Sequence, residues 1–255
     1  LKNTLPTELS LQQLAFDPLG KMLAVLGSTR IQLWNFHTSQ LVWEINLQGR
    51  AETFALSPEG MIAVAGTFID NDTEGVEQHS IHIWHIRSQK QQRTLQGHPL
   101  PVTVLTYSPN GQWLASGSAD NTVKLWETAN GNLKQTLTSH KDTVTALTFR
   151  PDNLLLASGS VDKTIALWEV RNGELIRTLT KPELAEIQSL SFTPDGYFLL
   201  SSHQGDREIV FWGGHPEFIM HMYYLNMLIK LGHLCDPQRN CIYGGWWQPW
   251  YDFEL

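Results

Sequence analysis

Five tryptophans recur at nearly constant spacing, and each one ends a short, mainly apolar stretch. The stretches read IQLW, IHIW, VKLW, IALW and IVFW, and the intervals between their tryptophans are 50, 42, 42 and 44 residues. The tryptophans are Trp34, Trp84, Trp126, Trp168 and Trp212. A fixed period of roughly 40 residues indicates a repeat architecture, in which each unit stacks on its neighbours.

A proline-containing turn keeps the same period as the tryptophans. The turns are DPLG at 17–20, SPEG at 57–60, SPNG at 108–111, RPDN at 150–153 and TPDG at 193–196. Proline fixes φ in such a turn, and glycine or asparagine takes the position that needs a positive φ. Between these markers apolar residues alternate with period two, as in 102–107 and 144–149, which predicts short β-strands.

Each unit is predicted to contain four strands. One precedes the proline turn, one follows it, one ends at the tryptophan, and the last follows a further turn, as in 133–137 and 175–179. A four-stranded sheet of this size cannot bury both faces alone, so the units must stack, and radial stacking gives a β-propeller. We therefore predict an all-β fold with about five four-stranded blades. The repeats lie around 6–49, 50–97, 98–139, 140–181 and 182–212.

Composition excludes several classes of function. The 255 residues carry 18 basic and 25 acidic side chains, so no overall positive field attracts nucleic acid or anionic lipid. Two cysteines are too few for a disulfide framework, and residues 1–10 lack the basic and apolar segments of a secretion signal. We expect a cytoplasmic protein without cofactor that binds neither nucleic acid nor membrane. Its start at Leu1 is consistent with a processed product or a piece of a longer protein.

Over residues 1–212 the repeats resemble the WD-repeat β-propeller family. The resemblance rests on Gly97-His98, on LASGSAD at 114–120, on LASGSVD at 156–162 and on the closing tryptophans. The third and fourth repeats fit best, and no repeat has a literal Trp-Asp pair.

The family resemblance also bears on how the propeller closes. It implies about seven blades as the usual number, and an N-terminal strand that completes the last blade. Here residues 1–5 would pair beside the strand that ends at Trp212 and close a five-bladed ring. If the ring stays open, two blade faces and an edge remain uncovered, and self-association is expected.

Two repeats carry the residue types of a hydrolase triad, at identical spacing. Each set also has a tryptophan six residues after its aspartate. The sets are His98, Ser116, Asp120 and Trp126, and His140, Ser158, Asp162 and Trp168. Because a catalytic constellation is normally built once, a copied set indicates something that every repeat needs. The resemblance implies a buried hydrogen-bond chain from indole to serine to histidine to aspartate. We therefore interpret both tetrads as structural and expect no catalytic residue and no enzyme.

The other three repeats have incomplete tetrads. Val25 and Ala65 replace the serine in the first and second repeats, and Glu183 replaces the histidine in the fifth. A partly satisfied buried network costs stability, so we predict that these three blades are softer than the middle two.

The leading functional hypothesis is a non-catalytic protein–protein interaction scaffold that displays loops of a rigid propeller. By the resemblance, the docking face is lined by Pro99, Leu100, Ala119, Lys141, Asp142, Val161 and Gly205, together with the long hairpin loop 68–78 that holds Asp70 and Asp72. That loop lacks the full ligand spacing of a calcium loop, so we expect no metal there and consider a basic partner. The alternatives are a regulatory or sensor domain of a larger signalling protein and a propeller hydrolase.

Residues 213–255 do not continue the repeat. They contain no Ser, Thr, Ala or Val, and they hold both cysteines. Three interpretations stay open: a genuine appendage, a fused segment or an out-of-frame reading. We predict an atypical tail that is helical or disordered. His233, Cys235 and Cys241 lack a recognised zinc spacing, so no metal is expected.

Overall fold

The computed structural model describes residues 9–69, 77–180, 185–205 and 208–213. These residues form nineteen β-strands in five antiparallel sheets and contain no helix. The all-β prediction is therefore confirmed. The chain divides into two compact units, Leu1–Trp212 and Gly213–Leu255. The predicted closing strand at 1–5 and the predicted state of the tail beyond Gly213 lie outside the described residues.

Each of the first four sheets holds four strands in chain order, and each corresponds to one predicted repeat. The first is β1 (Gln13–Phe16), β2 (Met22–Leu26), β3 (Arg30–Asn35) and β4 (Gln40–Asn46). The second is β5 (Gly49–Leu56), β6 (Met61–Ile69), β7 (Glu77–His85) and β8 (Lys90–Gln96). The third is β9 (Val102–Tyr107), β10 (Trp113–Ser118), β11 (Thr122–Glu127) and β12 (Leu133–Thr138).

The last two sheets complete the described part of the first unit. The fourth is β13 (Val144–Phe149), β14 (Leu155–Ser160), β15 (Thr164–Glu169) and β16 (Leu175–Thr180). The fifth has three described strands, β17 (Ile187–Phe192), β18 (Leu199–His203) and β19 (Ile209–Trp212). We call these sheets the first to fifth blades.

The proline turns between the first and second strands of each blade have the predicted conformation. The fourth turn residue has a positive φ in every case: Gly20 67°, Gly60 80°, Gly111 71°, Asn153 67° and Gly196 75°. Glycine and asparagine adopt this left-handed region at least cost, which explains why only they occur there.

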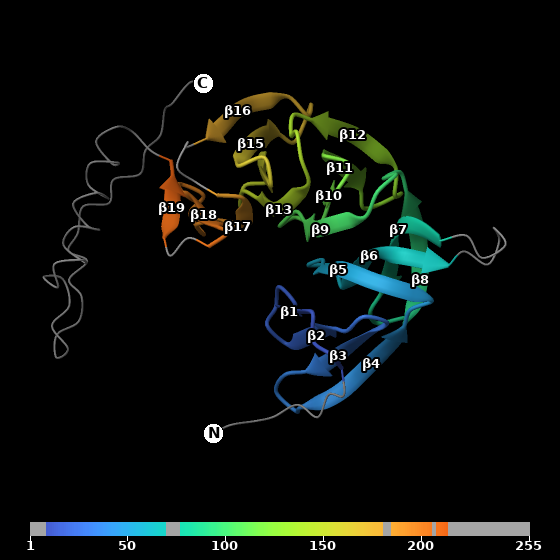
Figure 1. The fold of residues 1–255 in the computed structure, drawn as a ribbon. Coiled ribbons are helices and arrows are strands. Elements are labelled where there is room, and N and C mark those ends of the chain that lie inside the picture. Colours follow the sequence, from blue (N-terminus) through green and yellow to red (C-terminus); the bar gives the residue numbers. More distant parts are fainter. Residues whose placement is uncertain (1–8, 70–76, 181–184, 206–207, 214–255) are drawn as a thin grey trace, which may run out of the picture. The chain divides into compact units, whose positions relative to one another are not determined.

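Neighbouring blades pack on each other in chain order. The contacts run between the first strands, β1 with β5, β5 with β9, β9 with β13 and β13 with β17, and these strands lie on the inner side in Figure 1. One hydrophobic cluster joins each pair of blades; for example, Val123 and Leu125 of the third blade lie with Leu147 and Phe149 of the fourth. Burying each such side chain contributes about 1.5–3 kcal/mol, so the stack is held mainly by its interfaces.

Small residues on the second strand let the blades approach closely. A Cβ on Gly159 would lie 2.4 Å from Ile187 Cγ2 of the next blade, and one on Gly117 would lie 2.6 Å from Val144 Cγ1. The repeated Ser-Gly-Ser at the end of this strand therefore reflects packing against the next blade. Thr103 Oγ1 and Thr145 Oγ1 add polar links across these interfaces, because they donate to the carbonyls of Val144 and Ile187.

The prediction of a loop at 68–78 in the second blade was wrong at both ends. Strands β6 and β7 are nine residues long and pair as far as Ile69 and Glu77, so the connection is only 70–76. The extended strand conformation continues to the end of β6 and places Phe68, 3% exposed, in the core shared by the first two blades. Asp70 and Asp72 lie outside the described residues.

In the described part of the chain, no helix is long and apolar enough to cross a membrane.

Candidate functional site

The tetrad of the third blade is a continuous hydrogen-bond chain. Trp126 Nε1 donates to Ser116 Oγ at 2.9 Å, Ser116 Oγ lies 2.8 Å from His98 Nε2, and His98 Nδ1 lies 2.7 Å from Asp120 Oδ2. The strand arrangement brings these side chains together. Ser116 lies on β10, Trp126 lies on the adjacent β11, and His98 lies in the segment that enters the blade.

The tetrad of the fourth blade has the same connectivity. Trp168 Nε1 donates to Ser158 Oγ at 2.8 Å, Ser158 Oγ lies 2.8 Å from His140 Nε2, and His140 Nδ1 lies 3.1 Å from Asp162 Oδ2. The two sets therefore coincide in atoms as well as in spacing. Such a repeated arrangement fits a need of each blade better than a single reactive centre.

The electrostatics of the third-blade tetrad favour a neutral histidine. Burial lowers the pKa of His98 below its ordinary value, and the hydrogen bond and charge of Asp120 offset this only in part. Burial would raise the pKa of Asp120, but hydrogen bonds from Thr122 and His98 outweigh it and lower the pKa. A neutral His98 that donates from Nδ1 accepts the Ser116 hydroxyl proton at Nε2, so all donors in the chain point from indole to carboxylate.

Neither tetrad presents its serine hydroxyl to solvent. Ser116 and Ser158 are 0% exposed, and each hydroxyl already accepts an indole N–H. A serine nucleophile must reach a substrate carbonyl, and these two hydroxyls cannot. The geometry therefore gives the tetrads a fastening role.

The sequence analysis missed two threonines that complete the tetrads. Thr122 and Thr164 each donate through Oγ1, at 2.6 Å, and through the backbone N–H, at 2.9 Å, to the aspartate two residues before them. The signal was present, because both threonines recur at the same offset from Asp120 and Asp162. These bonds hold the carboxylate in place for the histidine.

Two incomplete repeats use local substitutes. In the first blade Trp34 Nε1 donates to Gln32 Oε1 at 3.3 Å. In the fifth, Trp212 Nε1 donates to Ser201 Oγ at 2.8 Å, and His203 Nε2 lies 3.3 Å from the same oxygen. His203 thus contacts the serine from within strand β18, a position that spacing alone did not suggest. Glu183 lies outside the described residues.

The described residues that were predicted to line the docking face lie on the entering loops and hairpin tips of the third, fourth and fifth blades. The hairpin tips and the entering loops are joined by Ala119 N–H to Pro101 O at 3.0 Å and by Val161 N–H to Thr143 O at 2.9 Å. Lys141 N–H also donates to Asp162 Oδ2 at 2.8 Å, so the loop is fixed by the tetrad itself. In the fifth blade the neighbour of Gly205, Gln204, donates to Glu186 O.

The side chains on these fixed loops differ in exposure. Pro99, Leu100, Lys141, Asp142 and Gly205 are exposed, whereas Ala119 and Val161 are half-buried. Leu100, 46% exposed, is the large apolar side chain among them.

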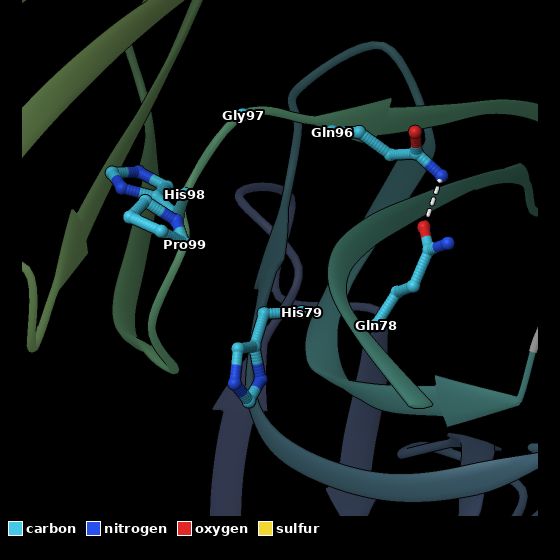
Figure 2. Close-up of a pocket in the computed structure, with 6 residues that line it drawn as sticks. All are labelled: Gln78, His79, Gln96, Gly97, His98 and Pro99. Carbon is cyan, nitrogen blue, oxygen red and sulfur yellow. Dashed lines mark hydrogen bonds between the residues drawn. The ribbon is translucent and has the colours of Figure 1, made fainter. Parts of the chain in front are cut away.

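A pocket of about 630 Å³ lies beside this end of the third blade. It is lined by Gln78, His79, Gln96, Gly97, His98 and Pro99. Figure 2 shows the amides of Gln78 and Gln96 joined by a hydrogen bond, 2.7 Å from Gln96 Nε2 to Gln78 Oε1, with His98 and Pro99 on the other side. The residues from β7 were not predicted, because only the longer β7 brings them here.

No group of three His, Cys, Asp or Glu side chains that could hold a metal ion occurs among the residues whose placement is described.

Comparisons with known proteins agree with this geometry. The family model for the WD domain, G-beta repeat, matches residues 89–127, 131–169 and 173–213. A Periodic tryptophan protein 2 homolog from Neurospora crassa is 38% identical over 68 residues, which is 27% of this chain and 7% of that protein. Anaphase-promoting complex subunit cdh1 from Dictyostelium discoideum is 30% identical over 104 residues, 40% of this chain and 13% of that protein. The matches therefore span a small part of either relative.

A solved structure shares the fold. A chain in the crystal structure of the mitotic checkpoint complex superposes with a TM-score of 0.68 and 24% identity, over 79% of this chain and 60% of that chain. The matched repeats and this superposition confirm both the resemblance and the propeller architecture. Residues 89–213 therefore contain three WD repeats, and the described sheets have the propeller fold.

Proposed function

We propose that this chain is a non-catalytic scaffold that binds a partner protein at the loop end of the third and fourth blades. The observation that carries the proposal is Leu100, an exposed apolar side chain on a loop whose carbonyl accepts a hydrogen bond from Ser118 Oγ at 3.2 Å. An anchor that is already ordered loses little conformational entropy on binding, which favours affinity. Lys141 and Asp142 supply a polar rim on the next loop.

The pocket next to Pro99 gives an extended segment of the partner a place to bind. One hydrogen bond joins Gln78 and Gln96, and each terminal amide has further donor and acceptor capacity. Such a pair suits a peptide backbone, which offers one donor and one acceptor per residue.

Related proteins support a role in assemblies. One similar protein is named as an anaphase-promoting complex subunit, and the superposed chain comes from a structure titled as a mitotic checkpoint complex. Fold does not determine function, so we transfer only the general role of binding proteins. The buried hydroxyls of Ser116 and Ser158 speak against the hydrolase alternative. The cytoplasmic location and the regulatory alternative stay predictions.

The test compares the full wild-type chain with its Leu100→Asp variant. Each is used to purify partner proteins, and quantitative mass spectrometry measures how much of each partner co-purifies. We expect at least one partner to bind more weakly by roughly tenfold or more, because loss of a hot-spot side chain costs about 2 kcal/mol or more and about 1.4 kcal/mol is a factor of ten. The matched control is Leu154→Asp, which alters a Leu that is 60% exposed beside a proline turn of the fourth blade. Equal recovery of every partner with both variants would contradict the proposal.

The third-blade tetrad also predicts a pH effect on stability. The folded-state pKa of His98 lies below its unfolded value, so the unfolded chain binds the extra proton as the pH falls. The contribution of this site is complete above the unfolded pKa of about 6.5 and is lost as the pH falls from there toward the folded pKa.

We expect the free energy of unfolding of the full chain, measured by urea titration, to decrease from pH 7.5 to pH 5.5. The His98→Gln variant should lose part of this slope, whereas Gln96→Ala, at an exposed neighbouring site, should keep it. An identical slope in wild type and His98→Gln would show that His98 does not titrate on unfolding.

A further inference from the structure

Every internal blade uses the same positions to receive the blade before it. In the third blade, Leu105 and Tyr107 on β9 are 6% and 8% exposed and lie in a cluster with Ile81 and Ile83 of the second blade. In the fourth, Leu147 and Phe149 hold the corresponding positions, counted back from the proline turn, and are 8% and 6% exposed. We call this surface the leading face of a blade.

The first blade exposes its leading face. Leu14 and Phe16, which precede the turn at Pro18 by the same intervals, are 55% and 51% exposed. Phe36, two residues after Trp34, is 49% exposed, whereas its counterpart Val170 is 3% exposed. Phe16 and Phe36 form an edge-to-face pair with ring centroids 5.0 Å apart. An exposed apolar group of this kind is typical of an interaction site.

The fifth blade exposes the opposite type of face, which we call the trailing face. In the third blade, Val123 and Leu125 on β11 are 0% exposed because the fourth blade covers them. Ile209 and Phe211, at the same distances before the closing tryptophan, are 59% and 41% exposed. The trailing face therefore also lacks the neighbour that every internal blade has.

We propose that a second copy of this chain docks its fifth-blade trailing face onto the first-blade leading face. Within one chain, each leading face from the second to the fifth blade is covered by the trailing face of the blade before it. A second copy would bring Ile209 and Phe211, which are apolar like Val123 and Leu125 at the matching positions, against the exposed leading face.

A polar contact of the internal interfaces can also be repeated between copies. Thr103 and Thr145 donate across their interfaces to a backbone carbonyl on the next first strand. Gln188 on β17 holds the corresponding position in the fifth blade and is exposed. Its amide can donate in the same way to the carbonyl of Leu11, the counterpart of Val144, in the other copy.

The contact joins two different surfaces, so it is head to tail. In a dimer of this kind, one leading face and one trailing face stay uncovered at the two ends. Further copies therefore bind there, unless the rotation between copies closes a ring. The proposal thus predicts assembly that grows with concentration beyond the dimer.

The test is sedimentation equilibrium of the full 255-residue chain from low to high micromolar concentration. We compare wild type with Leu14→Asp, which places a charge on the leading face, and with Phe211→Asp, which places one on the trailing face. Both positions are exposed, so folding should survive, and circular dichroism checks it. Leu154→Asp is the control, because it changes an exposed Leu in the turn outside both faces.

We expect wild type and Leu154→Asp to form dimers and larger species, and each face variant alone to stay monomeric. A mixture of the two face variants should form dimers and stop there, because Leu14→Asp retains a trailing face and Phe211→Asp a leading face. A monomeric wild type at all concentrations would mean that the chain covers its own faces and would overturn the proposal. Association that Leu14→Asp abolishes but Phe211→Asp leaves intact would also overturn it, since that pattern requires like faces to meet.

Discussion

Replacing Trp168 by alanine is expected to lower the free energy of unfolding by about 3–5 kcal/mol. Trp168 is 2% exposed and lies in the cluster that joins the third and fourth blades. Its loss removes a large buried ring and also the indole donor to Ser158. The cost is therefore the sum of a cavity and one lost hydrogen bond to a buried hydroxyl, which keeps its bond to His140. Urea titration of the full chain measures it.

Two further variants separate these contributions. Trp168→Phe keeps most of the apolar volume and removes the N–H, so we expect a loss of about 1–3 kcal/mol. Trp43→Ala alters a half-buried tryptophan on β4 and should cost less than Trp168→Ala. If Trp168→Ala does not fold, the comparison of Trp168→Phe with wild type still measures the contribution of the indole hydrogen bond. A Trp168→Phe protein as stable as wild type would show that the indole bond contributes nothing.

Much of the blade architecture could be predicted, because local rules and tertiary packing agree in this chain. The proline turns need glycine or asparagine at one position, and the strands alternate with period two, so both features are readable from neighbouring residues. The extension of β6 and β7 was not readable in this way. The segment 66–69 continues the strand because Phe68 finds a place in the core between the first two blades, and only tertiary contacts supply that place.

The tetrads, too, could be predicted from the sequence only in part. Equal spacing in two repeats was enough to group Ser116 with His98 and to argue for a fastening role. The contact of His203 with Ser201 was not predictable, because it comes from within strand β18 and not from the loop that carries histidine in the matching repeats. In the first blade, Gln32 takes the acceptor role of the serine because its longer side chain reaches the Trp34 indole. A comparison of residue types at matching positions of the repeats does not reveal this.

The exposure of the faces of the first and fifth blades could not be predicted from the repeat. Identical positions are buried in the internal blades and exposed at Leu14 and Phe211, so the sequence of a blade does not record whether a neighbour covers it. The structure supplied this information.

Hydrogen exchange of the tryptophan indole N–H groups tests most directly the claim that the complete tetrads are buried links. The chain would be labelled with nitrogen-15 at tryptophan, followed by NMR in D₂O, and assigned with Trp-to-Phe variants. Trp126 and Trp168 are 3% and 2% exposed and donate into four-membered chains, whereas Trp34 has a longer bond to Gln32 and Trp212 is half-buried.

We expect the indoles of Trp126 and Trp168 to exchange at least ~100-fold more slowly than those of Trp34 and Trp212, a difference of about 2.8 kcal/mol in opening free energy. This result would also support the prediction that the blades with incomplete tetrads are softer. Equal exchange rates for all four indoles would contradict the account, because the tetrads would then add no protection to the blades that contain them.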